Sequence, residues 1–217
     1  FVRENWTCLN GEWDFSFDTA SFERKIVVPF CYQSKASGIH ESAEHEIVWY
    51  RRKFSVDLSQ IKEGTLLLKF GAVDSHADVW VNGHFLGTHV GGYTPFSFDI
   101  TALVVGEENV LVVRACDGKN ADKPRGKQTW TGEPFGCWYT PVTGIWQSVW
   151  LEYTGAVYLQ RVKCTPNVEK LEALCELFVS GNDAIEAEIV ASCNGVQLCR
   201  QNITCSNGYG KAGLQFP

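Results

Sequence analysis

The sequence VWVNGHFLGTHVGGYTPFSFDI, residues 79–100, decides the fold class of this chain. Val79 and Val81 stand at alternate positions, as the buried face of a half-buried strand requires. Asn82-Gly83 supplies the two residues that tolerate a positive φ in a tight hairpin turn. A second alternating run then follows the Gly91-Gly92 pair: Phe96, Phe98 and Ile100, with Ser97 and Asp99 between them. The stretch therefore predicts a β-hairpin and a further strand.

Another apolar run comes after the turn at Gly106. Leu111 and Val113 alternate with Val110 and Val112, and this continuous run predicts a strand buried on both faces. Consecutive strands joined by tight turns, with no helix between them, predict an antiparallel meander. We expect the rest of the chain to be built onto it.

Composition narrows the possible partners and compartments. The chain has 217 residues, of which 45% are hydrophobic, so one large β domain or two smaller ones can each form a core. The formal net charge of −6 argues against nucleic acid as a partner. No apolar run approaches the ~20 residues that span a bilayer, so we expect no membrane partner. The chain starts at Phe1 and has no Met, which indicates that the natural start lies upstream.

The nine cysteines indicate the compartment and argue against a metal site. Nine is an odd number, so they cannot all pair within one chain, and several lie inside predicted strands. No Cys or His spacing resembles that of a zinc site. We therefore expect reduced, structural cysteines, a cytoplasmic location, and neither a metal nor another cofactor.

Two long segments without strand patterning interrupt the first part of the chain, at residues 30–46 and 117–144. Long irregular loops are often functional. The second is rich in Gly, Pro, Trp and Tyr, and two interpretations of its rings remain open. They form a platform on which sugars or bases stack, or they cover one open end of the core. Strands are predicted around these segments at residues 13–17, 26–28, 48–56, 65–70 and 145–153.

The character of the sequence changes at Thr154-Gly155. Aromatic residues become fewer, and short strands recur with turns between them, which is typical of an immunoglobulin-like sandwich. Only four or five strands fit before Pro217, fewer than the ~7 of that fold. We therefore predict two domains, residues 1–153 and 154–217, with the second incomplete and its exposed strand edges favouring a homo-oligomer.

The sequence contains no recognisable catalytic constellation. It has no GxSxG, HExxH, Walker or GxGxxG motif, and its five His residues are scattered. Hydrolysis of a glycoside needs two carboxylates ~5 to 10 Å apart, one with a raised pKa. Glu41, Glu44 and Glu46 cluster in the first long segment, but nothing in an exposed loop would raise a carboxyl pKa. The residues alone therefore predict an all-β chain without catalytic machinery.

Five ordered blocks carry a resemblance to a known family. They are VPFCYQSKASGI (28–39), VWYRRKFSV (48–56), VWVNGHFLGTHVGGYTPFSFDIT (79–101), PRGKQTW (124–130) and TGIWQSVWLEY (143–153). Together they resemble the N-terminal region of glycoside hydrolase family 2, which includes β-galactosidases, β-glucuronidases and β-mannosidases. The resemblance implies a jelly-roll sugar-binding domain over residues 1–153, followed by the start of an immunoglobulin-like domain.

The resemblance also implies where the family's activity resides. In the family a (β/α)₈ barrel follows and carries both catalytic glutamates, and this chain shows no βα alternation, so no catalytic residue can be assigned in it. Loops of the jelly roll can reach the rim of the active site. The candidate substrate-binding residues, all in the second long segment, are Arg125, Lys127, Gln128, Trp138 and Tyr139.

Three functional hypotheses follow. The first is a non-catalytic N-terminal fragment of a retaining β-glycosidase of the β-galactosidase type, which meets carbohydrate in the full-length enzyme. The second is a freestanding carbohydrate-binding module that uses Trp130, Trp138 and Tyr139 as a stacking platform. The third is a purely structural domain that self-associates and binds no ligand.

Overall fold

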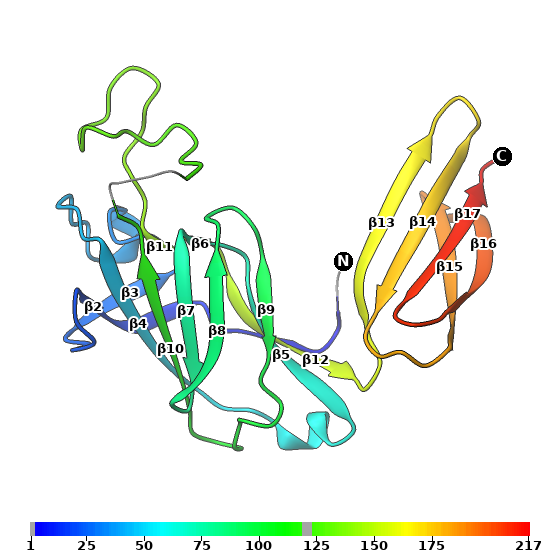
Figure 1. Ribbon diagram of the computed structural model, residues 1–217, viewed down its shortest axis with the longest axis horizontal. Helices are drawn as coiled ribbons and strands as arrows, with labels where there is room; N and C mark the ends of the chain where they lie inside the picture. The colour runs from blue at the N-terminus through cyan, green and yellow to red at the C-terminus, as the bar shows by residue number, and fades with distance from the viewer. Residues whose placement is uncertain (1–2, 119–122) are drawn as a thin grey trace. The chain divides into compact units, whose positions relative to one another are not determined.

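A computed structural model describes residues 3–118 and 123–217, so residues 119–122 of the predicted loop 117–144 lie outside the described part. The chain divides into two compact units, Phe1–Thr154 and Gly155–Pro217 (Figure 1). Both consist of antiparallel β-sheets, which confirms the all-β prediction. In the described residues no helix is long and apolar enough to cross a membrane.

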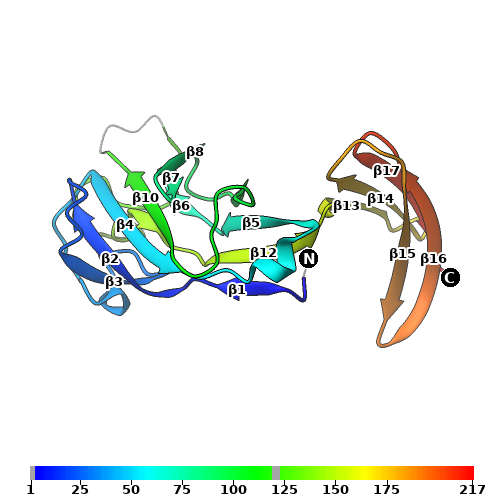
Figure 2. The same ribbon diagram turned by 90° about the horizontal axis from the view of Figure 1, so that it is seen from below.

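Unit 1 contains two main sheets and a small one (Figure 2). The six-stranded sheet has the order β3 (Arg24–Val28), β2 (Gly11–Phe17), β4 (Ile47–Phe54), β10 (Asn109–Cys116), β7 (His76–Val81) and β8 (His84–Val90). The four-stranded sheet has the order β1 (Trp6–Cys8), β12 (Val149–Gly155), β5 (Gly64–Phe70) and β9 (Phe96–Asp99). Strands β11 (Gly144–Ile145) and β6 (Val73–Asp74) form a third pair, and the two 3₁₀ helices are η1 (Lys35–Ser37) and η2 (Leu58–Ile61).

The hairpin of β7 and β8 forms as predicted. Val81 pairs with His84, and Asn82 and Gly83 take φ values of 51° and 81° in the turn between them. The Asn82 side chain also fixes the next connection, because its Nδ2 donates to the Leu103 carbonyl at 2.8 Å. Its Oδ1 accepts from the Val110 amide at 2.8 Å. One turn residue therefore ties the hairpin to β10.

The predicted meander is wrong beyond this hairpin. Strand β9 leaves the hairpin's sheet and pairs with β5 in the opposite sheet. There the Phe96 ring stacks on that of its cross-strand partner Phe70, with centroids 4.7 Å apart, so apolar packing between paired strands, not proximity in sequence, selects the partner strand. Strand β10 lies between β4 and β7. Its Val110 and Val112 are half-exposed, so this strand is buried on one face and not on both.

The predicted strand 145–153 is broken in two. Ile145 belongs to the small sheet, whereas Val149 begins β12 of the four-stranded sheet. The residues between them cross from one sheet to the other, and the Trp146 indole donates to the Gly92 carbonyl at 2.8 Å on the way. The sequence IWQSVWLEY is rich in apolar residues on both sides of Gln147-Ser148, which is why its pattern did not reveal the break.

The core of unit 1 is built from aromatic residues of the central strands. Trp13, Phe15 and Tyr50 are at most 1% exposed. Their rings meet edge to face, with the Phe15 and Tyr50 centroids 5.1 Å apart. Such contacts stabilise a core beyond the burial of area alone. The alternation in residues 13–17 thus predicted the strand and the burial of Trp13 and Phe15, although Ser16 on the other face is buried as well.

Unit 2 is smaller. One sheet has the order β13 (Leu159–Asn167), β14 (Glu172–Val179) and β17 (Tyr209–Gln215), and the other pairs β15 (Ile185–Cys193) with β16 (Val196–Cys205). Its core cluster consists of Leu177, Val179, Ile203 and Cys205. The unit has the five strands that the sequence allowed and forms a partial immunoglobulin-like sandwich.

Candidate functional site

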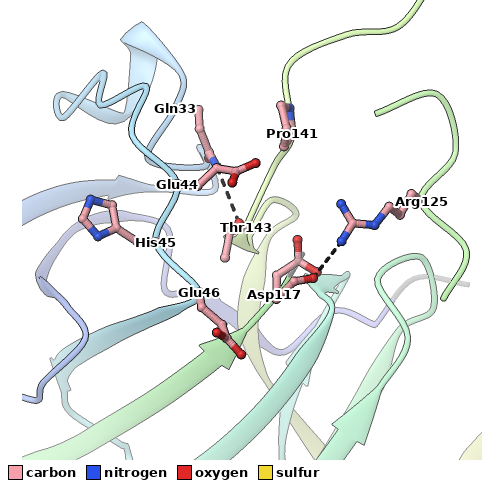
Figure 3. A pocket seen from close by; sticks show the side chains of 9 residues that line it. Gln33, Glu44, His45, Glu46, Asp117, Arg125, Pro141 and Thr143 are labelled. Atoms are coloured by element: carbon pink, nitrogen blue, oxygen red, sulfur yellow. Dashed lines mark hydrogen bonds between the residues drawn. The ribbon is translucent and has the colours of Figure 1, made fainter. Parts of the chain in front are cut away.

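The two long segments meet at one end of unit 1. They enclose a cavity of about 560 Å³ (Figure 3). The first segment contributes Gln33, Glu44, His45 and Glu46, and the second contributes Asp117, Gly118, Arg125, Pro141 and Thr143. Gln33 and Thr143 lie 110 positions apart in sequence, and yet the Gln33 amide reaches the Thr143 hydroxyl at 3.5 Å.

The first segment is held in place by a buried tyrosine. The Tyr32 side chain is fully buried, and its hydroxyl donates to the Ala43 carbonyl at 3.2 Å and accepts from the His45 amide at 3.0 Å. The His45 ring stacks on Phe17 with centroids 3.6 Å apart. The segment is therefore an ordered wall of the cavity, although its sequence has no strand or helix pattern.

One residue of the cavity wall has an amide oxygen without a donor. Gln33 Oε1 is buried and has no hydrogen-bond partner among the described residues. A buried acceptor left unpaired costs free energy, about 1–3 kcal/mol, and native proteins rarely retain one without a reason.

Charged side chains line the second wall. Asp117 accepts a hydrogen bond from the Ser75 hydroxyl at 3.0 Å and forms an ion pair with Lys123. The Arg125 guanidinium donates to the Gly118 carbonyl at 2.7 Å and faces the cavity (Figure 3). Of the sequence candidates, Arg125 is the one that lines this cavity. In the part of the chain that the structure describes, no group of three or more His, Cys, Asp or Glu could hold a metal ion.

A buried carboxyl supports the second segment from below. Gln128 Nε2 donates to Asp74 Oδ2 at 2.8 Å, and Gln128 Oε1 accepts from the Val142 amide at 2.8 Å. Both side chains belong to residues at most 4% exposed. Burial raises the pKa of Asp74 to about 6, although the hydrogen bond from Gln128 opposes the shift. Gln128 therefore holds the base of the segment and is not exposed to a ligand.

Aromatic rings cluster at the outer part of the same segment. Trp130 packs edge-on against Trp138, with ring centroids 4.8 Å apart, and against Phe135 at 5.3 Å. Phe135 and Trp138 are joined by two backbone hydrogen bonds that close a tight turn. Trp130 remains 63% exposed. These three rings lie outside the core cluster of unit 1, so they do not cover the core.

The remaining two candidates lie on the surface of the segment. Tyr139 is 48% exposed, and its amide donates to the Lys127 carbonyl at 2.9 Å. The Lys127 side chain is exposed. Thus the structure places one candidate in the cavity, one in the buried support and three at the surface. Gln33, His45 and Asp117 were missed, because only the approach of two distant segments reveals them.

Comparison with known proteins shows the family of this chain. Residues 22–151 match the glycosyl hydrolases family 2, sugar binding domain. The chain belongs to this family. It is 33% identical over 159 residues to a β-galactosidase of Thermoanaerobacter pseudethanolicus, and the match covers 71% of this chain and 20% of that protein. A putative β-glucuronidase of Formosa agariphila is 27% identical over 95% of this chain and 18% of its own length.

Solved structures agree on the fold. Faecalibacterium prausnitzii β-glucuronidase superposes with a TM-score of 0.73 and 22% identity, over 100% of this chain and 42% of that one. The chain therefore spans about one fifth of the length of the curated relatives above and less than half of this solved structure.

Proposed function

We propose that this chain is the non-catalytic N-terminal part of a retaining β-glycosidase of the β-galactosidase type, and that the loop end of unit 1 faces the sugar. In such an enzyme one glutamate protonates the leaving oxygen and another forms the glycosyl-enzyme. Both would belong to a (β/α)₈ barrel that is not part of this sequence. The chain acts as its scaffold and contributes loop residues beside the substrate.

One observation carries this proposal. The cavity combines polar and charged side chains of both segments, among them Gln33, Glu44 and Arg125, and exposed aromatic rings lie on the second segment. Sugars present hydroxyl groups that hydrogen-bond to such side chains, and apolar ring faces that stack on indoles. Family membership supports a glycoside as the substrate class. Relatives divide between β-galactosidases and β-glucuronidases, so both sugars belong in the test.

The test uses the reading frame of the source gene. The enzyme that this frame encodes is assayed on aryl β-galactosides and aryl β-glucuronides. Its Gln33→Ala and Trp130→Ala variants and the chain 1–217 alone are assayed on the same substrates. Gln33→Ala should lower kcat/KM by ~10-fold, the effect of losing one hydrogen bond to the sugar. Lys62→Ala, at an exposed position of unit 1 next to η2, is the control and should leave kcat/KM unchanged. Measurable turnover by the chain alone would refute the non-catalytic assignment.

A freestanding carbohydrate-binding module is the second candidate. The exposure of Trp130, held edge-on by Trp138, favours it, because an indole fixed in this way can stack on a sugar ring. Calorimetry with the chain and millimolar galacto- and glucurono-oligosaccharides tests it. Saturable binding that Trp130→Ala abolishes supports the module, and an absence of heat with every oligosaccharide refutes it.

A further inference from the structure

Two cysteines face each other across neighbouring strands of unit 2. Cys164 of β13 and Cys175 of β14 are direct partners in the antiparallel register. Their sulfur atoms lie 3.4 Å apart, and both are free thiols. They are close because the strand register places them there, with the turn that joins the two strands between them.

The spacing of the two strands suits a covalent bond. Residues directly opposite in an antiparallel pair have Cα atoms roughly 4.5–5.5 Å apart, within the roughly 4.4–6.8 Å that a disulfide spans. The sulfurs need to approach by about 1.4 Å to reach the ~2.05 Å of an S–S bond. Side-chain rotation supplies such a movement without a change of register.

The two thiols differ in their access to solvent. Cys164 is exposed, whereas Cys175 is 3% exposed. Burial, together with the neighbouring thiols of Cys164 and Cys199, raises the pKa of Cys175 to about 11. A reagent from solvent therefore reaches Cys164 first, and Cys175 is placed to attack from within the sheet.

We propose that Cys164 and Cys175 form a reversible dithiol–disulfide site, oxidised by exchange with a low-molecular-weight disulfide such as that of a tripeptide thiol. The Cys164 thiolate attacks one sulfur of the reagent, a mixed disulfide forms, and one reagent thiolate leaves. Cys175 then gives its proton to water and attacks Cys164 Sγ, and the second reagent thiolate leaves. The protein loses two electrons and two protons, and the reagent disulfide becomes two thiols.

The bond would fix the outer strand of a sheet. β13 is an edge strand, paired with β14 alone in the sheet order. A crosslink between residues 164 and 175 holds this edge in register and prevents its local opening. Both residues belong to unit 2. The site is therefore independent of the proposed role of the loops in unit 1.

Peptide mapping of the intact chain tests the proposal. The purified protein is incubated with an excess of the oxidised tripeptide thiol, free thiols are alkylated, and trypsin is added. Cleavage after Lys163 and Lys170 releases Cys164 on peptide 164–170, without another cysteine. Further cleavage by a glutamyl endopeptidase after Glu169, Glu172 and Glu176 shortens this peptide to 164–169 and isolates Cys175 on peptide 173–176. We expect these two sites to be crosslinked, with a loss of two hydrogen masses, and separated again by dithiothreitol.

Matched variants exclude other pairings. Cys199→Ser removes a rival thiol that neighbours Cys175 and should leave the crosslink intact, whereas Cys164→Ser and Cys175→Ser should each abolish it. Hydrogen exchange of residues 159–167 adds a second readout: it should slow on oxidation in the wild type and in Cys199→Ser, but not in Cys164→Ser or Cys175→Ser. A crosslink from Cys164 to Cys193 or Cys199, or a mixed disulfide at Cys164 that persists under excess oxidant, would overturn the proposal.

Discussion

The two units follow the same alternating pattern and reach very different degrees of burial. In β2 of unit 1, Trp13 and Phe15 are at most 1% exposed. In β16 of unit 2, Val196 and Leu198 stand at alternate positions and are 64% and 39% exposed. Unit 1 stacks a six-stranded sheet on a four-stranded one, whereas unit 2 has sheets of three and two strands. Alternation assigns a residue to a face, and the number of neighbouring strands decides whether that face is buried.

Truncation of a core side chain in each unit tests this comparison most directly. Phe15→Ala removes a fully buried ring and should lower the free energy of unfolding by about 4 kcal/mol. Leu177→Ala, 6% exposed in the small cluster of unit 2, should cost about 2 kcal/mol, because the open neighbourhood can collapse into the space. Hydrogen exchange followed separately in peptides of each unit measures both. Equal losses would show that the two cores are equally well packed.

Glycine substitutions give the next largest contrast. Gly144 has φ +92°, and an added Cβ would lie 2.1 Å from the Tyr50 hydroxyl oxygen. Gly144→Ala should therefore cost about 3 kcal/mol, from the clash and the unfavourable backbone. Gly213 of β17 is the control, because nothing lies within 4 Å of its would-be Cβ. Gly213→Ala should change stability by less than about 0.5 kcal/mol in denaturant titrations. A tolerated Gly144→Ala would contradict the packing of Tyr50 beneath the second segment.

The buried carboxyl at the base of the candidate site gives a pH-dependent effect. Burial raises the pKa of Asp74 from 3.8 to about 6, so the folded state holds this proton more tightly than the unfolded state does. The contribution of Asp74 to stability is therefore most favourable below pH ~4, falls as pH rises to ~6, and is constant above. Asp74→Asn should raise the free energy of unfolding by about 2 kcal/mol at pH 7 and change it little at pH 4.

An exposed carboxyl provides the control of opposite sign. Hydrogen bonds from Ser59 and Gln60 lower the pKa of Asp57, so its contribution is present at pH 7 and lost as pH falls below the usual range. Asp57→Asn should therefore destabilise at pH 7 and not at pH 3. Thermal unfolding from pH 3 to 8 measures both variants. A pH-independent effect of Asp74→Asn would show that folding does not change the pKa of Asp74.

The smallest expected effect concerns self-association. Unit 2 has an apolar groove of about 380 Å³ beside β15, where Val190 is 44% exposed. We expect weak dimerisation through unit 2, because exposed apolar strand edges pair readily. Sedimentation equilibrium should show association that Val190→Lys weakens, while the exposed Val105 of unit 1 serves as the control in Val105→Lys. A monomer at every concentration would exclude this contact.

The candidate site shows which of its features local sequence patterns can predict. The aromatic and basic density of residues 124–139 identified the second segment, and Arg125 proved to line the cavity. The same density gave no means to separate Gln128, which is buried against Asp74, from the exposed Lys127 beside it. The exposure of a side chain in an irregular segment depends on which residues pack beneath it. The sequence pattern of such a segment does not predict this packing, because the segment has no regular period. The role of these residues toward a sugar remains a prediction.

Local patterns predicted most of the strands, the Asn82-Gly83 turn and the buried face of strands such as β2 and β7, because period two and turn chemistry act over a few residues. The blocks of residues 28–153 also sufficed to indicate the family. Local patterns did not reveal that β9 joins β5, that residues 146–148 cross between sheets, or that Gln33 meets Thr143. These outcomes depend on packing between residues far apart in the chain, where the free energy of the whole core selects one partner among several with equivalent local patterns.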